Sequence, residues 1–202
     1  MKFALIGNGG HAREIMAQMG VTLTRFVDDK FCDHSDPMVR PLSEFDPNEF
    51  SVMIAIGDSN DRKEVFERLP LETGYFTFIH PSAQLMSDSI KIGEGSFVGA
   101  NCVLTCDIKI GNHALLNRGV QIGHDCHIGD FFSAMPGTVV SGGVVIKECA
   151  YLGTNSTILE NVHIGHNIKI GAGACVIEGL GYPGVYVGVP AKLLIKWKYV
   201  FL

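Results

Sequence analysis

The sequence predicts an α/β N-terminal domain of Rossmann-like βαβ order, followed by an all-β domain that is a parallel β-helix of hexapeptide repeats. The first observation is an apolar residue at every sixth position from Ile92 to Val176. This period fits neither an α-helix nor an alternating strand, and it is typical of hexapeptide β-helices. The second observation is that residues 1–78 alternate short apolar runs with a glycine-rich turn and helical stretches, which is the order of βαβ units.

The composition argues against several classes of protein. The 202 residues carry a formal net charge of -5 and no block of basic residues, so we expect no nucleic-acid partner. No apolar run approaches the roughly 20 residues that a membrane-spanning helix needs, and the apolar residues 3–6 are too few for a signal peptide. The 6 cysteines are scattered without CxxC pairs, which does not support a disulfide framework or a zinc site. We therefore expect a soluble, cytoplasmic protein.

In the N-terminal domain, each predicted strand ends in residues that suit a ligand. The predicted strands cover residues 2–6, 24–27 and 52–56, and the predicted helices cover residues 13–19 and 61–69. The strands end in Gly7-Asn8-Gly9-Gly10-His11-Ala12, in Asp28-Asp29 and in Gly57-Asp58. Because the carboxyl ends of parallel strands meet at one edge of a sheet, we expect these turns to surround one binding site.

The first of these turns resembles a dinucleotide-binding fingerprint. Its glycines allow a close backbone approach, and the helix that follows presents an N-terminus that favours phosphate. Asp28 ends the second strand, where a carboxylate suits a ribose or a base edge. A whole dinucleotide needs a larger fold than the roughly 78 residues available, so we expect a mononucleotide-sized ligand. A turn with a purely structural role is the alternative.

The repeat region, residues 79–192, explains its own residue types. Apolar side chains at every sixth position, with small or apolar residues two positions earlier, fill a narrow bore. Tight corners favour Gly, Asn and Asp, and about five coils stack because one coil cannot bury its own interior. The tail, residues 193–202, carries Trp197, Tyr199 and Phe201, so we expect it to pack on the β-helix or on a neighbouring subunit.

One polar pair stands out against the periodic aliphatic residues. His124 lies two positions after an inward residue, so we expect it near a corner and facing outward, with Asp125 beside it to orient the imidazole. A carboxylate-supported histidine is a common arrangement for a general base. Asn117 lies about one strand upstream. Two His-x-x-His pairs, at 124–127 and 163–166, lack further ligands at metal spacing, so we expect no metal site.

A set of short motifs spread over Met1 to Lys192 carries a resemblance. The motifs are Gly7-Asn8-Gly9-Gly10-His11-Ala12, Phe26-Val27-Asp28-Asp29, Ile54-Ala55-Ile56-Gly57-Asp58 with Arg62, Ile79-His80-Pro81-Ser82-Ala83, Asn117 with His124-Asp125, Ile128-Gly129-Asp130, and Gly188-Val189-Pro190-Ala191-Lys192. The chain is similar to the sialic-acid-type sugar O-acyltransferase family, and most closely to its bacillosamine-pathway branch, the acetyl-CoA-dependent N-acetyltransferases of nucleotide-linked 4-amino-sugars. The resemblance implies a left-handed β-helix, a homotrimer with active sites between subunits, and acetyl-CoA as co-substrate.

The resemblance also implies a role for each matching residue. His124 is the base that takes a proton from the sugar amine, Asp125 supports it, and Asn117 belongs to the same catalytic set. The backbone amide of Gly142 is the donor near the thioester oxygen. The residues expected to hold the nucleotide-sugar are Gly9, Gly10, His11, Asp28, Asp29 and Gly57. The residues expected along the coenzyme are Ser133, Gly142, Thr154, Ala172 and Lys192.

Two features depart from the family pattern. Ser133 stands where close relatives carry a second histidine that contacts the acetyl-CoA, and the loop over residues 178–183 lacks the common Lys-Asp-Val-Pro.

The expected chemistry is direct acetyl transfer in a ternary complex, because no Cys or Ser nucleophile is placed beside His124. The expected acceptor is a nucleotide-linked 4-amino-4,6-dideoxyhexose, and the branch resemblance alone favours UDP over dTDP or GDP. The alternatives are O-acetylation of a sugar hydroxyl, as on sialic acid, and a non-catalytic β-helix that acts as a scaffold or a sensor.

Overall fold

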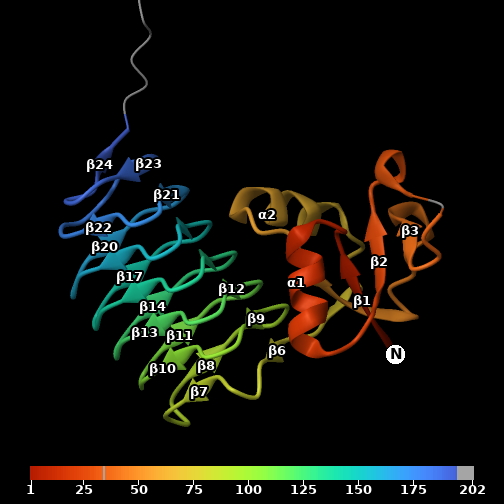
Figure 1. Cartoon of the computed structure of the whole chain (residues 1–202), viewed down its shortest axis with the longest axis horizontal. Helices are drawn as coiled ribbons and strands as arrows, with labels where there is room; N and C mark the ends of the chain where they lie inside the picture. Colours follow the sequence, from red (N-terminus) through yellow and green to blue (C-terminus); the bar gives the residue numbers. More distant parts are fainter. Residues whose placement is uncertain (34, 195–202) are drawn as a thin grey trace, which may run out of the picture.

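The computed structural model describes residues 1–33 and 35–194, and it contains an α/β domain beside a long parallel β-helix (Figure 1). This is the fold class that the sequence predicts. The tail was predicted to pack on the β-helix or on a neighbouring subunit. Its residues 195–202 lie outside the described part of the chain. Within the described residues, no helix combines the length and the apolar character that crossing a membrane requires.

The N-terminal domain is a five-stranded parallel sheet with helices on both faces. In spatial order its strands are β3 (Val39–Pro41), β2 (Thr24–Val27), β1 (Lys2–Ile6), β4 (Phe50–Ile54) and β5 (Gly74–Tyr75). The helices are α1 (Gly10–Met19) and α2 (Ser59–Arg68), with short 3₁₀ turns η1 (Asp29–Phe31) and η2 (Leu42–Glu44). Leu5 of β1 packs with α1, and its neighbours Ala4 and Ile6 pack with the side that α2 covers, because successive strand residues point to opposite faces.

Three predicted elements have other bounds in the structure. The third long strand is Phe50–Ile54 rather than residues 52–56, and both helices begin earlier than predicted. At the start of α2 the reason is local, because the Asp58 carboxylate accepts hydrogen bonds from the amides of Asn60 and Asp61. Such an N-cap satisfies two amides that the first turn of a helix leaves free.

The β-helix has three faces of stacked parallel strands. Face 1 contains β6 (Phe78–Ile79), β9 (Phe97–Val98), β12 (Leu115–Leu116), β15 (Ser133–Ala134), β18 (Tyr151–Leu152), β21 (Ile168–Ile170), β23 (Gly184–Val187) and the antiparallel β24 (Lys192–Leu193). Face 2 contains β7 (Gln84–Leu85), β10 (Val103–Leu104), β13 (Gln121–Ile122), β16 (Val139–Val140), β19 (Thr157–Ile158) and β22 (Cys175–Val176). Face 3 contains β8 (Lys91–Ile92), β11 (Lys109–Ile110), β14 (His127–Ile128), β17 (Val145–Ile146) and β20 (His163–Ile164).

The period of six predicted the interior of the β-helix. The inward residues from Val98 to Val176 are buried, and Ile92 in a lower coil is half-buried. Every residue of the second register, from Ile90 to Ala174, is buried as well. Strand register pairs each residue with the one three hexads later, for example Val103 with Gln121, so each side chain stacks on its counterpart in the next coil.

The corners follow the predicted preference with one group of exceptions. Left-handed φ angles occur mostly at Asn, Asp and Gly, but also at His113, Phe131 and Cys149. These three residues form one column under α2, where the rings of His113 and Phe131 stack 5.1 Å apart and the Phe66 ring of α2 lies 4.7 Å from His113. Packing against the N-terminal domain therefore outweighs the local preference for small polar corner residues.

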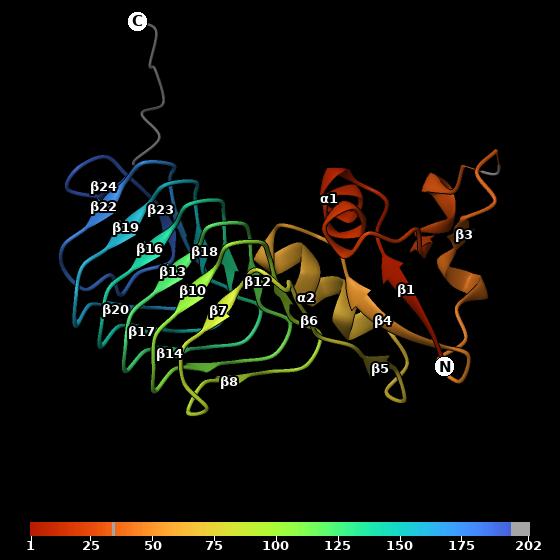
Figure 2. The same cartoon turned by 60° about the horizontal axis from the view of Figure 1, so that its bottom comes forward.

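The N-terminal domain packs on face 1 alone among the three faces of the described β-helix, with both helices beside it (Figure 2). Helix α1 meets the edge between faces 1 and 2 through Glu14 and Gln18, which contact Asn117 and Ala100. Helix α2 meets the edge between faces 3 and 1 through Arg62. The edge between faces 2 and 3 is therefore the one farthest from the N-terminal domain.

Candidate active site

A cavity of about 590 Å³ lies at the carboxyl ends of β1, β2 and β4. Its glycine-rich end comes from residues 7–11 and Gly57, next to the N-terminus of α1, and its apolar end includes Phe31, Leu42 and Val65. Gly7 has a φ of +116, and a Cβ there would lie 3.2 Å from the Ala55 carbonyl oxygen. The turn therefore brings bare backbone to the cavity, which suits a phosphate at one end and a flat ring at the other.

Five of the six residues predicted to hold the nucleotide-sugar line this cavity, namely Gly9, Gly10, His11, Asp28 and Gly57. Asp29 instead lines an adjoining hollow of about 570 Å³ that shares Asp28 and Leu42. The Asp29 carboxylate accepts a hydrogen bond from the Ser43 amide at 3.2 Å. Asp29 thus holds the loop that borders the cavity.

The His11 imidazole is uncharged at neutral pH. Burial lowers its pKa to about 4, against a smaller opposing effect of Glu14. Its Nδ1 lies 3.7 Å from Glu14 Oε2, and its buried Nε2 has no hydrogen-bond partner among the described residues. A buried polar atom without a partner is uncommon in a folded protein, and here it belongs to a residue that lines the cavity.

Asp28 has a partner that the sequence reasoning missed. Arg68, at the end of α2, donates to both oxygens of the Asp28 carboxylate. The hydrogen bond from Arg68 lowers the pKa of Asp28. The two residues are 40 positions apart, so no local sequence pattern indicates that they pair.

His124 and Asp125 lie at the edge between faces 2 and 3, with side chains 64% and 66% exposed. His124 Nδ1 lies 2.7 Å from Asp125 Oδ2, so the carboxylate orients the ring and Nε2 is the nitrogen that remains for a substrate. Gly142 stands one coil further along the same edge, and a Cβ there would lie 2.6 Å from both Cε1 and Nε2 of His124. The imidazole therefore rests directly against the bare Cα of Gly142.

Cys106 also belongs to this edge and was missed in the sequence reasoning. It lies one coil before His124, as the hydrogen bond from the Asp125 amide to the Cys106 carbonyl shows, and counting 18 residues back from His124 would have found it. Partial desolvation and the carboxylates of Asp107 and Asp125 raise the pKa of its thiol. A protonated thiol is a poor nucleophile.

The remaining predicted residues lie elsewhere. Asn117 is at the edge between faces 1 and 2, where its side chain donates to Glu14 and accepts from the Arg118 amide. Thr154 and Ala172 are exposed on that same edge, and Lys192 is exposed on β24. Within one chain, His124, Asp125 and Gly142 therefore lie on one edge of face 2, and Asn117, Thr154 and Ala172 lie on the other.

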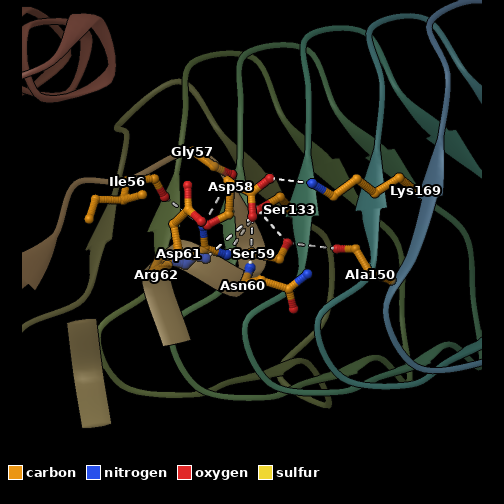
Figure 3. A network of polar contacts seen from close by, with 10 residues as sticks. All are labelled: Ile56, Gly57, Asp58, Ser59, Asn60, Asp61, Arg62, Ser133, Ala150 and Lys169. Carbon is orange, nitrogen blue, oxygen red and sulfur yellow. Dashed lines mark hydrogen bonds and ion pairs between the residues drawn. The ribbon is translucent and has the colours of Figure 1, made fainter. Parts of the chain in front are cut away.

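The expectation for Ser133 is wrong in this structure. Its side chain is fully buried under the start of α2, not open to a coenzyme. Ser133 Oγ donates to the Gly57 carbonyl at 2.9 Å and accepts from Arg62 Nη2 at 2.9 Å, and Ser59 Oγ lies 3.0 Å away (Figure 3). The hydroxyl is used in joining the two domains.

Comparison with known proteins shows what the chain is similar to. Residues 2–69 match the family model of the PglD N-terminal domain. The GDP-perosamine N-acetyltransferase of Escherichia coli O157:H7 is 31% identical over 121 residues, which cover 59% of this chain and 54% of that protein. The chain thus spans about half the length of this curated relative.

Two solved structures match almost the whole chain. The acetyltransferase domain of PglB from Neisseria gonorrhoeae FA1090 is 27% identical with a TM-score of 0.82, covering 96% of this chain and 99% of that one. PerB from Caulobacter crescentus, solved in complex with CoA and GDP-perosamine, is 29% identical with a TM-score of 0.72, covering 96% and 97%. The predicted resemblance to the bacillosamine-pathway acyltransferases is confirmed: residues 2–69 match the PglD N-terminal domain, and almost the whole chain shares its fold with the PglB and PerB acetyltransferases.

Proposed function

We propose that the protein is an acetyl-CoA-dependent N-acetyltransferase that acts on the 4-amino group of a nucleotide-linked 4-amino-4,6-dideoxyhexose. The observation that carries the proposal is His124, whose Nδ1 is held by Asp125 at 2.7 Å and whose side chain is 64% exposed. The nucleotide-sized cavity on the N-terminal domain supports it. So do the relatives, of which PerB was solved with CoA and GDP-perosamine and PglB with acetyl coenzyme A.

In the proposed reaction His124 is the general base. The Asp125 carboxylate accepts the Nδ1–H, which leaves Nε2 to take a proton as the sugar nitrogen attacks the thioester carbonyl. The C–N bond forms, and the oxyanion is stabilised by the Gly142 amide. The C–S bond then breaks, and the departing coenzyme A thiolate takes up a proton.

Transfer is direct, without an acyl-enzyme. Two thiols lie near His124, Cys106 one coil earlier on the same edge and the buried Cys126 two residues later, and the pKa of each is raised rather than lowered. An activated nucleophile needs the opposite shift. The sugar amine is therefore the attacking group in this proposal.

The placement of the residues supports an active site between subunits of a homotrimer. All residues that line the cavity fall between Ile6 and Val65, on the domain that packs on face 1. His124 and Gly142 occupy the edge opposite face 1, and Thr154 and Ala172 occupy the other edge of face 2. A second chain is needed to bring the two edges together, and a cyclic trimer does so three times.

The inter-subunit site can be tested with mixed trimers. His124→Ala damages one edge of face 2, and Thr154→Trp blocks the other. If each site uses one edge from each of two chains, an equal mixture refolded or expressed together regains about a quarter of the wild-type sites. Mixed trimers as inactive as the parents, or a monomer by light scattering, would contradict this arrangement.

The activity itself is tested by thiol release from acetyl-CoA against UDP-, dTDP- and GDP-linked 4-amino-4,6-dideoxyhexoses and free sialic acid. Turnover on one nucleotide-linked amine that disappears in His124→Ala supports the proposal and names the nucleotide. Turnover on sialic acid alone indicates O-acetylation. No turnover and no change of Tm with acetyl-CoA indicates a non-catalytic β-helix.

A further inference from the structure

Arg62 is a charged side chain buried between the two domains. The residue is 2% exposed, and its hydrogen-bond acceptors in the described chain are neutral oxygens. They are the carbonyls of Ile56, Gly57, Asp58, His113, Phe131 and Phe132 and the hydroxyl of Ser133. Burial lowers the pKa of Arg62 to about 10, so the guanidinium keeps its charge at neutral pH.

The acceptors come from two places that are far apart in the sequence. Nη1 donates to the loop after β4, with the Ile56 carbonyl 2.6 Å away. Nε and Nη2 donate to the edge between faces 3 and 1, at 2.9 Å to the His113 carbonyl and 3.0 Å to the Phe131 carbonyl. The planar guanidinium thus bridges a wall of the cavity and the β-helix.

The same loop is held from two further sides (Figure 3). Ser133 Oγ donates to the Gly57 carbonyl, and Ser59 Oγ lies 3.1 Å from the Ala150 carbonyl. Lys169 of β21 forms an ion pair with Asp58 at 2.5 Å. Gly57 lines the cavity, so these contacts with the β-helix fix the position of one cavity wall.

Stability alone is a weak reason for such a network. Burying a charge is costly, and replacing buried ionic groups with apolar ones is often neutral or stabilising. A guanidinium with five donors in a rigid fork does serve geometry, because it binds several acceptors in one plane. A lysine ammonium is compact and cannot reach both sets of carbonyls.

We propose that Arg62 is a positioning residue for the acceptor substrate: it fixes the Gly57 wall of the cavity on the β-helix and thereby sets where the nucleotide-sugar binds. Ser133 serves this purpose in place of contacting the coenzyme. The proposal rests on the proposed function for the identity of the ligand. The role of Arg62 concerns the nucleotide-sugar and not the coenzyme, since the acceptors of Arg62 do not include Gly142, Thr154 or Ala172.

The test compares Arg62→Met and Arg62→Lys with the matched control Lys63→Met. Lys63 is the next residue of α2 and also pairs across the domains, with Glu148 at 3.5 Å, but on the surface. We expect both Arg62 variants to raise KM for the nucleotide-sugar about tenfold or more, with KM for acetyl-CoA changed less than about twofold. Calorimetric titration with UDP, GDP and dTDP measures the expected loss of nucleotide affinity without relying on turnover. Lys63→Met stays within about twofold of wild type throughout.

Two outcomes overturn the proposal, and a further variant covers the case of misfolding. If Arg62→Met lowers Tm but keeps nucleotide affinity and KM, Arg62 only joins the domains. If Arg62→Lys restores full affinity, the planar fork is not required. If the Arg62 variants do not fold, Ser133→Ala decides, since it removes the hydrogen bond to Gly57 and must weaken nucleotide binding. A wild type that binds no nucleotide and acetylates none of the sugars refutes the proposed function itself, whereas wild-type binding that is equal in the variants refutes only the role of Arg62.

Discussion

Gly142→Ala changes the position of the candidate base without removing any polar group. The added Cβ would lie 2.6 Å from Cε1 and Nε2 of His124, whereas carbon atoms in contact are ordinarily about 3.5 Å apart or more. The ring must therefore move by about 1 Å. Because the His124 side chain is 64% exposed, it moves into solvent rather than into packed atoms, and we expect little change in Tm.

The cost falls on catalysis. A displacement of about 1 Å at a reacting group can lower the rate about 100-fold, and the shift also strains the 2.7 Å contact between His124 Nδ1 and Asp125. We expect kcat to fall by about that factor while KM for the nucleotide-sugar changes little. The backbone amide of residue 142 is kept, so the loss reports the ring and not the oxyanion donor.

The assay is steady-state thiol release with the sugar identified from the panel, together with thermal unfolding of the same preparation. Gly74→Ala is the control, since a Cβ there meets its nearest atoms at 3.8 Å and lies in the N-terminal sheet. A Gly142→Ala enzyme with wild-type kcat would refute the placement of His124 Nε2 at the reacting amine. A large fall in Tm would show instead that the corner backbone, and not the ring, gives way.

Three further predictions follow from the same structure. His124→Ala should lower kcat by the roughly 10²- to 10⁴-fold that the loss of a general base costs, with unchanged acetyl-CoA binding by calorimetry; normal turnover would remove it from the role. Cys106→Ser should keep kcat within about twofold if transfer is direct, and mass spectrometry of enzyme with acetyl-CoA alone should detect no acetylated Cys106. Burial lowers the pKa of His113 to about 4, from about 6.5 in an unfolded chain. As pH falls below about 6.5, His113 is protonated in the unfolded state but stays neutral in the folded state. The contribution of His113 to the free energy of unfolding is therefore lost progressively down to about pH 4. Between pH 7 and pH 5 the free energy of unfolding should drop by about 2 kcal/mol from this residue, and His113→Phe, which repeats Phe131 in the stack, should lack that part of the drop in urea titrations.

Local chain order was enough to predict much of the fold. A period of six decides which side chains enter the bore, and it needs no information beyond neighbouring positions, so the buried registers from Ile90 to Val176 were foreseen. The strand-turn-helix order of the N-terminal domain was foreseen for the same reason. The contact between His124 and Asp125 follows from adjacency, because an outward histidine at a corner meets the next residue's carboxylate.

Only the tertiary structure decided which polar residues lie together on one edge or face. Stacking at 18 residues puts Cys106 and Gly142 on the edge of His124, and docking of one domain on face 1 buries Ser133 and pairs Asn117 with Glu14. Docking is set by contacts between residues as distant as Arg62 and Phe132, 70 positions apart. Side chains that serve such contacts look, in sequence alone, like any other polar corner or helix residue, because their partners are chosen by packing and not by chain order.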